Sequence, residues 1–331
     1  MLLISLSTYR QHADADHQFA TLLNDIRPQS LELFEMFSSS QIGAESFLAL
    51  NCHRESLKEL KLNDIKAEAI PAISMMRGCT SLTCLMMAEN GGATQDLEKS
   101  HNDIFLETIA WLTQCKDLKT ISISKMLSAP ALLTPILLEN NIRLTSLELD
   151  CYEAREGYGS GYLMSKSRDF HQALACQTTL QSLWLNGESS DLGLDVDILV
   201  DSISKLENLT DLRLRFISDY FSNQHIRHLA KSLPKLETWW THGWAVTDAI
   251  WRDITSLKQL RRLDFNANTR FTANGILNLI MELGPGNHGF ELSINKADMD
   301  FDLSEEEQTM IREALKSQVD GRFDFALVRG K

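Results

Sequence analysis

The sequence has little cysteine, and its cysteines are not spaced for chemistry. Six cysteines among 331 residues are too sparse for the disulfide framework of a small secreted domain. No CxxC pair is present, so the spacing gives no indication of a zinc site or a dithiol redox pair. The nine histidines show no spacing with carboxylates or cysteines that is typical of a metal or catalytic site. We therefore expect no metal and no cofactor.

The sequence also lacks a long apolar run and a surplus of basic residues. No apolar run reaches the roughly 18 residues of a candidate membrane-spanning helix. The opening MLLISLSTYRQ has neither the basic start nor the longer apolar core of a secretory signal. The net charge of -13 disfavours binding to nucleic-acid phosphates and leaves neutral or basic partners open. We expect a cytoplasmic or nuclear protein that binds neither nucleic acid nor membrane.

Common catalytic motifs are missing too, among them the P-loop, HExxH and GxSxG. GPGNHG at 284–289 fits G-x-G-x-x-G, but it follows a predicted helix and precedes a predicted strand, the reverse of a dinucleotide-binding site. The acidic run at 298–309 has Leu303 and Thr309 where a calcium loop has Gly and Glu. We interpret the first as a helix-ending loop and the second as an acidic turn before a helix. We therefore expect that this protein is not an enzyme.

What the sequence does contain is a repeat of the pattern Leu, two residues, Leu, one residue, Leu. LETWWT at 236 fits this pattern, except that Trp239 occupies the position of the second leucine. Weaker copies are residues 2–6, SLELF with its last position at 33, FELSI at 290 and FDFAL at 323. The clear copies are LKELKL at 57, LTCLMM at 82, LKTISI at 118, LTSLEL at 144, LQSLWL at 180, LTDLRL at 209 and LRRLDF at 260.

Amphipathic stretches with helical spacing lie between the copies. Examples are 224–233, 271–283 and 304–316, the last beginning with a capping box of Ser304 and Glu307. Each repeat is therefore predicted to form a strand, a turn and a helix. One strand and one helix cannot bury their apolar faces alone, so stacked units must share a continuous core that holds the repeated leucines.

These copies resemble the leucine-rich repeat family, in its helix-containing subclass of ribonuclease-inhibitor-like and F-box-type proteins. The resemblance covers nearly the whole chain. It implies an α/β leucine-rich repeat solenoid, a horseshoe with an inner parallel sheet and outer helices. It also implies one domain over 1–331 with about eleven or twelve repeats. The chain opens inside a predicted strand, with no amino-terminal cap and no visible F-box, so we expect further sequence or a partner to cover this edge.

Side chains along a strand alternate between two faces. This alternation distinguishes residues that pack in the core from residues that could bind a partner. Trp239 should face the core, and Trp240 the concave surface. In the same register Trp184, Arg213, Trp240 and Asp264 should form one row across four strands. Trp and Arg are enriched at interface hot spots, so we predict a partner-binding surface here. Its flanking members are Asn186, Asp211, Arg215, His242, Arg262 and Asn266.

The alternative is that Arg213 stacks on Trp184 or Trp240 as a cation–π pair that serves only the scaffold. Trp244 and Trp251 belong to the connecting loop and the next helix, where we expect core packing. The equivalent row in the amino-terminal half contains no tryptophan or arginine and has charges of both signs. It consists of Lys61, Met86, Ser122 and Glu148.

Two insertions, at 88–103 and 151–167, should leave the same edge of the solenoid. The second holds Tyr152, Tyr158 and Tyr162 among glycines, a composition that is common in binding loops. These three tyrosines are secondary candidates for partner binding. The alternative is that this loop has no binding role.

Three cysteines, Cys79, Cys115 and Cys176, fall three or four residues before a first leucine. We interpret this recurrence as small buried apolar residues.

Together these observations predict a non-catalytic protein–protein interaction scaffold that binds a partner through its concave face. The F-box resemblance implies the substrate-recognition part of a ubiquitin-ligase subunit. The alternative is a regulator or inhibitor of another enzyme, like ribonuclease-inhibitor-like or GTPase-activating repeat proteins.

Overall fold

The structure is a computed structural model. It describes residues 2–6, 15–36, 42–65, 67–89, 96–150, 161–187, 196–218, 220–243 and 245–327. The chain forms two compact units, of which the first comprises Met1–Ala154 and Ser165–Gln177 and the second Arg155–Met164 and Thr178–Lys331. Their combination into one continuous domain stays a prediction.

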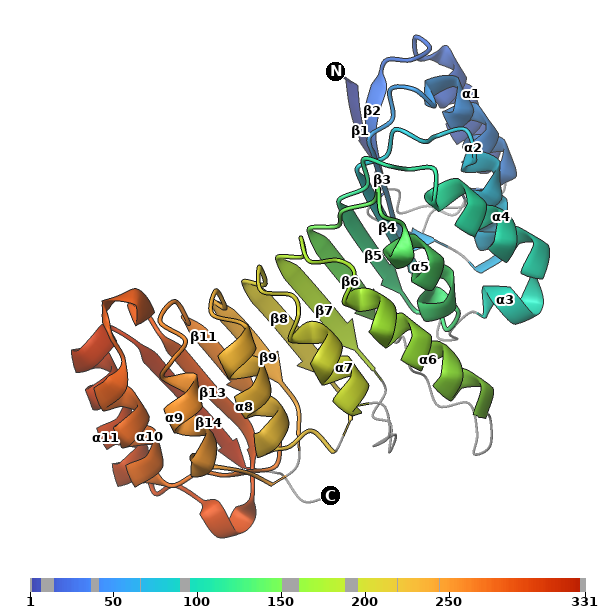
Figure 1. The fold of residues 1–331 in the computed structure, drawn as a ribbon. Helices are drawn as coiled ribbons and strands as arrows, with labels where there is room; N and C mark the ends of the chain where they lie inside the picture. Colours follow the sequence, from blue (N-terminus) through green and yellow to red (C-terminus); the bar gives the residue numbers. More distant parts are fainter. Residues whose placement is uncertain are drawn as a thin grey trace. The chain divides into compact units, whose positions relative to one another are not determined.

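The first unit contains a parallel sheet whose strands follow one another in chain order, each paired with the next. Its strands are β1 (Leu2–Leu6), β2 (Leu31–Met36), β3 (Glu59–Ile65), β4 (Cys84–Glu89), β5 (Thr120–Ser124) and β6 (Ser146–Asp150). The helices between them lie along one face of this sheet (Figure 1). They are α1 (Ala15–Asp25), α2 (Ala44–Leu50), η1 (Asn51–His53), η2 (Ala67–Met76), α3 (Leu97–Ser100), α4 (Asn102–Leu112), α5 (Ala129–Leu138) and α6 (Gly161–Leu174), of which α6 belongs to this unit from Ser165 on.

The second unit repeats this plan, with parallel neighbours in the order β7, β8, β9, β11, β13 and β14. Two short strands extend from β13, which pairs with β12, which in turn pairs with β10. The strands are β7 (Ser182–Asn186), β8 (Asp211–Arg215), β9 (Thr238–Thr241), β10 (Val246–Thr247), β11 (Arg262–Phe265), β12 (Thr269–Arg270), β13 (Glu291–Ala297) and β14 (Arg322–Leu327). The helices are α7 (Val196–Ile203), α8 (Asn223–Ser232), η3 (Asp248–Ile250), α9 (Trp251–Ile254), α10 (Ala273–Glu282), η4 (Pro285–Asn287), η5 (Met299–Phe301) and α11 (Glu305–Val319).

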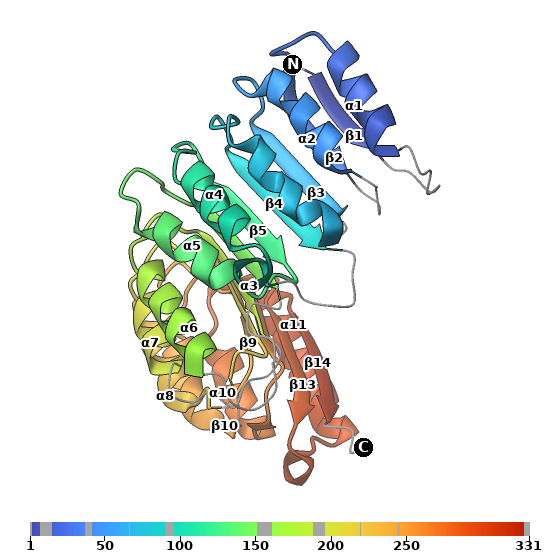
Figure 2. The same cartoon turned by 90° about the vertical axis from the view of Figure 1, so that its right-hand side faces the viewer.

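The buried apolar side chains of each unit come from its strands and from the helices that lie along one face of the sheet (Figure 2). Along β5, β6, β7 and β8 burial alternates residue by residue, with the repeated leucine or isoleucine positions buried and their neighbours half-buried. The leucine positions also align across strands, as in Leu212, Trp239 and Leu263, which are all fully buried. The predicted α/β leucine-rich repeat solenoid is therefore the fold of this chain, and Trp239 fills a leucine position as predicted.

Most predicted element boundaries are confirmed within a few residues. The helix predicted at 304–316 is α11, and Ser304 and Glu307 form the capping box at its start. GPGNHG ends α10 and contains η4, as a loop between a helix and a strand. The insertion predicted at 151–167 differs, because α6 already begins at Gly161. The insertion predicted at 88–103 likewise holds the short α3 and the start of α4.

The second repeat lies in a different frame from the one predicted. The sheet pairs Phe34 with Leu60 and Met36 with Leu62, and Leu31, Phe34 and Met36 are buried. This copy therefore reads Leu31-x-x-Phe34-x-Met36, and its last position is 36 rather than 33. Phe and Met fill the leucine positions because the core selects for apolar volume rather than for leucine itself.

The cysteine prediction is wrong for Cys176. Cys79 and Cys115 are fully buried, but Cys176 is exposed. The buried position is the one three residues before the first leucine, and in this repeat it belongs to Gln177. The Gln177 amide donates to the carbonyls of Leu137 and Ile142 and accepts from the amide of Leu144, so a polar side chain is fully satisfied there.

Candidate functional site

The strand register of the second unit forms the row of side chains that the sequence predicted. Trp184 pairs with Arg213, Arg213 with Trp240, and Trp240 with Asp264. These residues alternate with the buried leucine positions, so the row lies on the sheet face that turns away from the helices. We call this surface the open face of the second unit. Trp184, Arg213 and Trp240 are half-buried there.

The part of the row around Arg213 is held by neighbours on the same face. Arg213 donates from Nε and from one terminal nitrogen to the two carboxylate oxygens of Asp211, at 2.9 and 2.8 Å. Its guanidinium carbon lies 5.7 Å from the centre of the Trp184 ring, within range of a cation–π contact. The stacking of Arg213 on Trp184, raised above as an alternative, is thus present, and it fixes both side chains in one orientation.

Asp264 and Asn266 contribute little to the surface. Asp264 is only 3% exposed and Asn266 only 9%. Asp264 accepts a 2.6 Å hydrogen bond from Nε of Arg262, which is itself exposed. That bond and the negative charge of Asp264 raise the pKa of Arg262. The sequence pattern placed Asp264 in the correct row but could not show its burial.

A cluster of cations and aromatic rings stands at the carboxyl ends of the strands. We call Arg215, Phe216, Trp240, His242 and Lys296 the cation–aromatic cluster. The Arg215 guanidinium carbon lies 4.8 Å from the Trp240 ring centre and 5.3 Å from that of Phe216. Lys296 Nζ lies 5.0 Å from the Phe216 ring centre, and the Phe216 and His242 rings are 5.3 Å apart.

Two members of this cluster, Phe216 and Lys296, were not predicted from the sequence. Phe216 follows β8 with a positive φ of 48°, which is a strained conformation for a bulky side chain. Lys296 lies in β13 where the pairing with β14 shifts between Ile294 and Ala297. Alternation along a strand does not extend across such irregularities, so the sequence carried no signal for either position.

The open face also holds polar atoms that its own side chains do not satisfy. The indole nitrogens of Trp184 and Trp240 and Nε of Arg215 are buried, and none has a hydrogen-bond partner within the described ranges. A buried donor without an acceptor costs about 1–3 kcal/mol. The open face therefore has unused hydrogen-bonding capacity beside its rings.

The corresponding face of the first unit is different. The register there confirms the predicted row of Lys61, Met86, Ser122 and Glu148. Lys61 is neutralised by Glu59 at 2.7 Å. This hydrogen bond raises the pKa of Lys61, against the opposing effect of burial. The row has no aromatic side chain.

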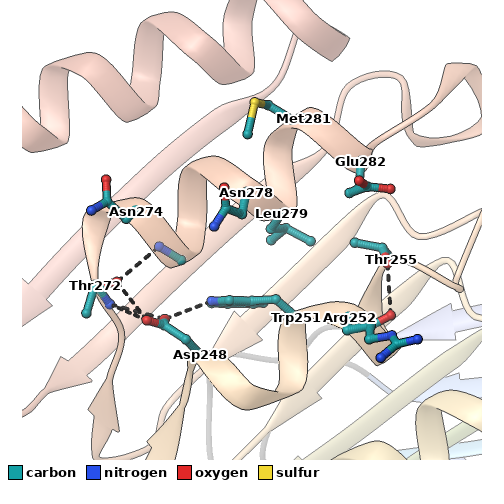
Figure 3. A pocket seen from close by; sticks show the side chains of 11 residues that line it. Asp248, Trp251, Arg252, Thr255, Thr272, Asn274, Asn278, Leu279, Met281 and Glu282 are labelled. Carbon is teal, nitrogen blue, oxygen red and sulfur yellow. Dashed lines mark hydrogen bonds between the residues drawn. The ribbon is translucent and has the colours of Figure 1, made fainter.

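A concavity lies on the helix side of the second unit, between α9 and α10, with a volume of about 640 Å³ (Figure 3). Asp248 lies at its base and accepts hydrogen bonds from the Trp251 indole, the Thr272 amide and the Thr272 hydroxyl, at 2.9, 3.1 and 2.7 Å. A Cβ on Gly275 would lie 2.2 Å from this carboxylate, so the glycine permits the close approach. Asp248 thus ties the start of α10 to the preceding repeat, and we assign it a structural role.

Trp251, at the same concavity, is a core residue, as predicted. It is buried and packs against Phe271 and Phe265, with ring centres 4.3 and 5.9 Å apart. Trp244, Tyr152 and Tyr158 lie outside the described residues. Tyr162 falls in the first turn of α6, but its side chain is not described.

Nothing in the described parts of the chain is arranged as a metal site, since no group of three or more His, Cys, Asp or Glu side chains comes together there. Burial raises the pKa of Cys79 and Cys115 to about 12, so both thiols stay protonated near neutral pH. No helix in those same parts is both long and apolar enough to cross a lipid bilayer.

No protein-family model matches the sequence, and no curated protein matches it either. Among solved structures, an internalin from Listeria monocytogenes str. 4b F2365 is 14% identical, with a TM-score of 0.38 and 95% of each chain covered. A chain of the yeast Rad7–Elc1 complex is also 14% identical, with a TM-score of 0.46, covering 92% of this chain and 80% of that one. Similarity this low does not bear on what the chain binds, and the assignment of the fold rests on its repeat and its strand register.

Proposed function

We propose that this protein is a non-catalytic scaffold that binds a protein partner through the open face of its second unit. The observation that carries the proposal is the alignment of Trp184, Arg213 and Trp240 on three adjacent strands, half-buried and on the side away from the helices. Tryptophan and arginine are enriched among the hot-spot residues of protein interfaces.

Scaffold packing alone does not account for this arrangement. Arg213 is already held by Asp211, yet the indole nitrogens of Trp184 and Trp240 are left without acceptors in the described chain. A partner that packs on the two half-buried rings would bury the surface that packing within the described chain leaves open.

The finer part of the proposal is that the partner is a substrate which the protein presents to a ubiquitin ligase. The resemblance of its repeats to those of F-box-type proteins supports this role. A cytoplasmic or nuclear location would fit it and stays a prediction.

An affinity pull-down from native lysate, read by mass spectrometry, tests the proposal. Wild type would be compared with a Trp240→Ala/Arg213→Ala variant and with Met86→Ala, a matched control on the open face of the first unit. Circular dichroism melting would verify that all three are folded. We expect a partner that wild type and Met86→Ala retain and the double variant loses.

Equal recovery of every partner by all three proteins would contradict the proposal. Ligase components or ubiquitylated proteins among the lost partners would support the presentation of a substrate. Stoichiometric capture of a single enzyme, with a change in its activity, would instead identify a regulator or inhibitor.

A further inference from the structure

The two cations of the cation–aromatic cluster differ from three other cations on the open face of the second unit. Arg213 is paired with Asp211, Arg262 with Asp264 and Arg322 with Glu291. Arg215 and Lys296 have no carboxylate within ion-pair distance among the residues that the structure describes, and each lies against an aromatic ring instead.

These two unneutralised cations stand close together. Both lie within 5.3 Å of the centre of the same Phe216 ring, so a single short segment can reach both. They carry positive charge in a protein whose net charge is -13. Holding two like charges together beside rings has an electrostatic cost, which an anionic group from outside would offset.

We propose that the cation–aromatic cluster binds an acidic segment of a partner protein. Carboxylates of that segment pair with Arg215 and Lys296, and an apolar side chain next to them packs on Trp240 and Phe216. The inference rests on the proposed function and specifies the chemistry of its partner. It also reverses the expectation from net charge, because the local charge of the cluster is opposite to that of the whole chain.

The geometry of Arg215 favours a carboxylate over a neutral acceptor. Its side chain is half-buried on the open face, and its guanidinium makes no ion pair within the described residues. A guanidinium presents parallel donors that match two carboxylate oxygens, and such charge-assisted pairs are shorter and stronger than neutral hydrogen bonds. The Trp240 ring beneath the guanidinium holds it in place, so little side-chain entropy is lost when the pair forms.

Selection from a phage-displayed library of random peptides tests the inference without knowledge of the natural partner. The selected peptides would be sequenced, and their affinities would be measured by fluorescence anisotropy at low and at high salt. The test variants are Arg215→Ala/Lys296→Ala and the charge reversal Arg215→Glu/Lys296→Glu. Lys61→Ala is the matched control, because Lys61 is an open-face cation already neutralised by Glu59. Melting curves would verify that each variant is folded.

We expect wild type and Lys61→Ala to select peptides enriched in Asp and Glu beside an apolar residue. These peptides should lose about tenfold or more in affinity for the alanine double variant, and the charge reversal should select Lys and Arg instead. Three results would each overturn the inference: no peptides above background, no acidic enrichment, or acidic peptides insensitive to both cluster variants.

The inference and the proposed function can fail separately. Non-acidic peptides that bind wild type but not Trp240→Ala would retain the open face as a binding surface and remove the acidic partner. Pull-down partners that are indifferent to Trp240→Ala/Arg213→Ala would remove the proposed function itself, whatever peptides the library yields.

Discussion

The two units share one plan of folding but differ in what they display. In both, the leucine positions of parallel strands are buried against the helices. On the open face, the row of the first unit is Lys61, Met86, Ser122 and Glu148. The equivalent row of the second unit carries tryptophan and arginine. Packing determines the residues on the core-facing side of each strand, whereas the residues on the open face can differ between repeats. The binding site is therefore expected where the open-face residues differ most between the two units.

The two adjacent tryptophans of β9 sharpen this contrast within one strand. Trp239 is fully buried in a leucine position and Trp240 is half-buried on the open face. We predict that Trp239→Ala lowers the free energy of unfolding by about 3–5 kcal/mol, because it leaves a large cavity in the core. Trp240→Ala should cost about 1 kcal/mol or less and should remove partner binding instead. Urea unfolding and pull-down on both variants would verify this difference, and equal destabilisation would contradict it.

Acid should weaken the first unit more than the second. His171 lies in the first unit and is buried. Burial lowers the pKa of His171 from 6.5 to about 4, so the folded state binds this proton less readily than the unfolded state does. The resulting stability is full above about pH 6.5 and is lost as the pH falls toward 4, by roughly 3 kcal/mol.

Hydrogen exchange measured separately on α6 and α8 would detect this loss, since α6 carries His171 and α8 lies in the second unit. We expect α6 to lose protection between about pH 6.5 and pH 4.5 and α8 to lose less. In His171→Phe, which cannot titrate, the difference between the helices should shrink. An unchanged pH dependence in that variant would assign the effect to other groups.

The neighbours Cys176 and Gln177 test the repeat frame itself. Gln177→Ala removes a buried amide with three hydrogen-bonded partners, and we expect it to destabilise the first unit by about 1–3 kcal/mol. Cys176→Ala, at an exposed position, should change stability by less than about 0.5 kcal/mol. Thermal melting of the two variants measures both effects, and the opposite ranking would restore Cys176 to the core.

This pair shows how far the sequence alone could lead. The repeat predicted the strands, the helices and the row of open-face residues, because each leucine is fixed by packing against its neighbours. The parallel pairing of the strands was implied by the resemblance to leucine-rich repeats. It failed where a position is satisfied in another way. Gln177 fills a cysteine position through hydrogen bonds, and Phe34 and Met36 fill leucine positions through volume.

The site was less predictable than the fold. Trp184, Arg213 and Trp240 follow from strand alternation. In contrast, Phe216 depends on a positive φ, Lys296 on an irregularity in strand pairing, and the burial of Asp264 on its tertiary surroundings. None of these has a periodic signature.

Each unit also contains one aspartate that ties neighbouring repeats together through hydrogen bonds. Asp16 accepts hydrogen bonds from the amides of Gly43, Glu45 and Ser46, as Asp248 accepts from Thr272. Burial alone would raise the pKa of Asp16, but these bonds and the Ser46 hydroxyl outweigh it and lower the pKa.

We expect Asp16→Ala and Asp248→Ala each to cost about 1 kcal/mol, measured by urea unfolding. Part of the Asp16 contribution should be lost at low pH, because protonation removes the negative charge and weakens the carboxyl oxygens as acceptors. A large loss in one variant and none in the other would mean that the two ties are not equivalent.

The central claim is that partners bind the open face of the second unit and not that of the first. Hydroxyl-radical footprinting of the protein, free and bound to a partner recovered by pull-down, tests it most directly. Trp184, Trp240 and Met86 are all half-buried and carry oxidisable side chains, so one experiment reports on both faces. The account predicts that Trp184 and Trp240 become protected while Met86 is oxidised as before. Protection of Met86 with both tryptophans unchanged would contradict it.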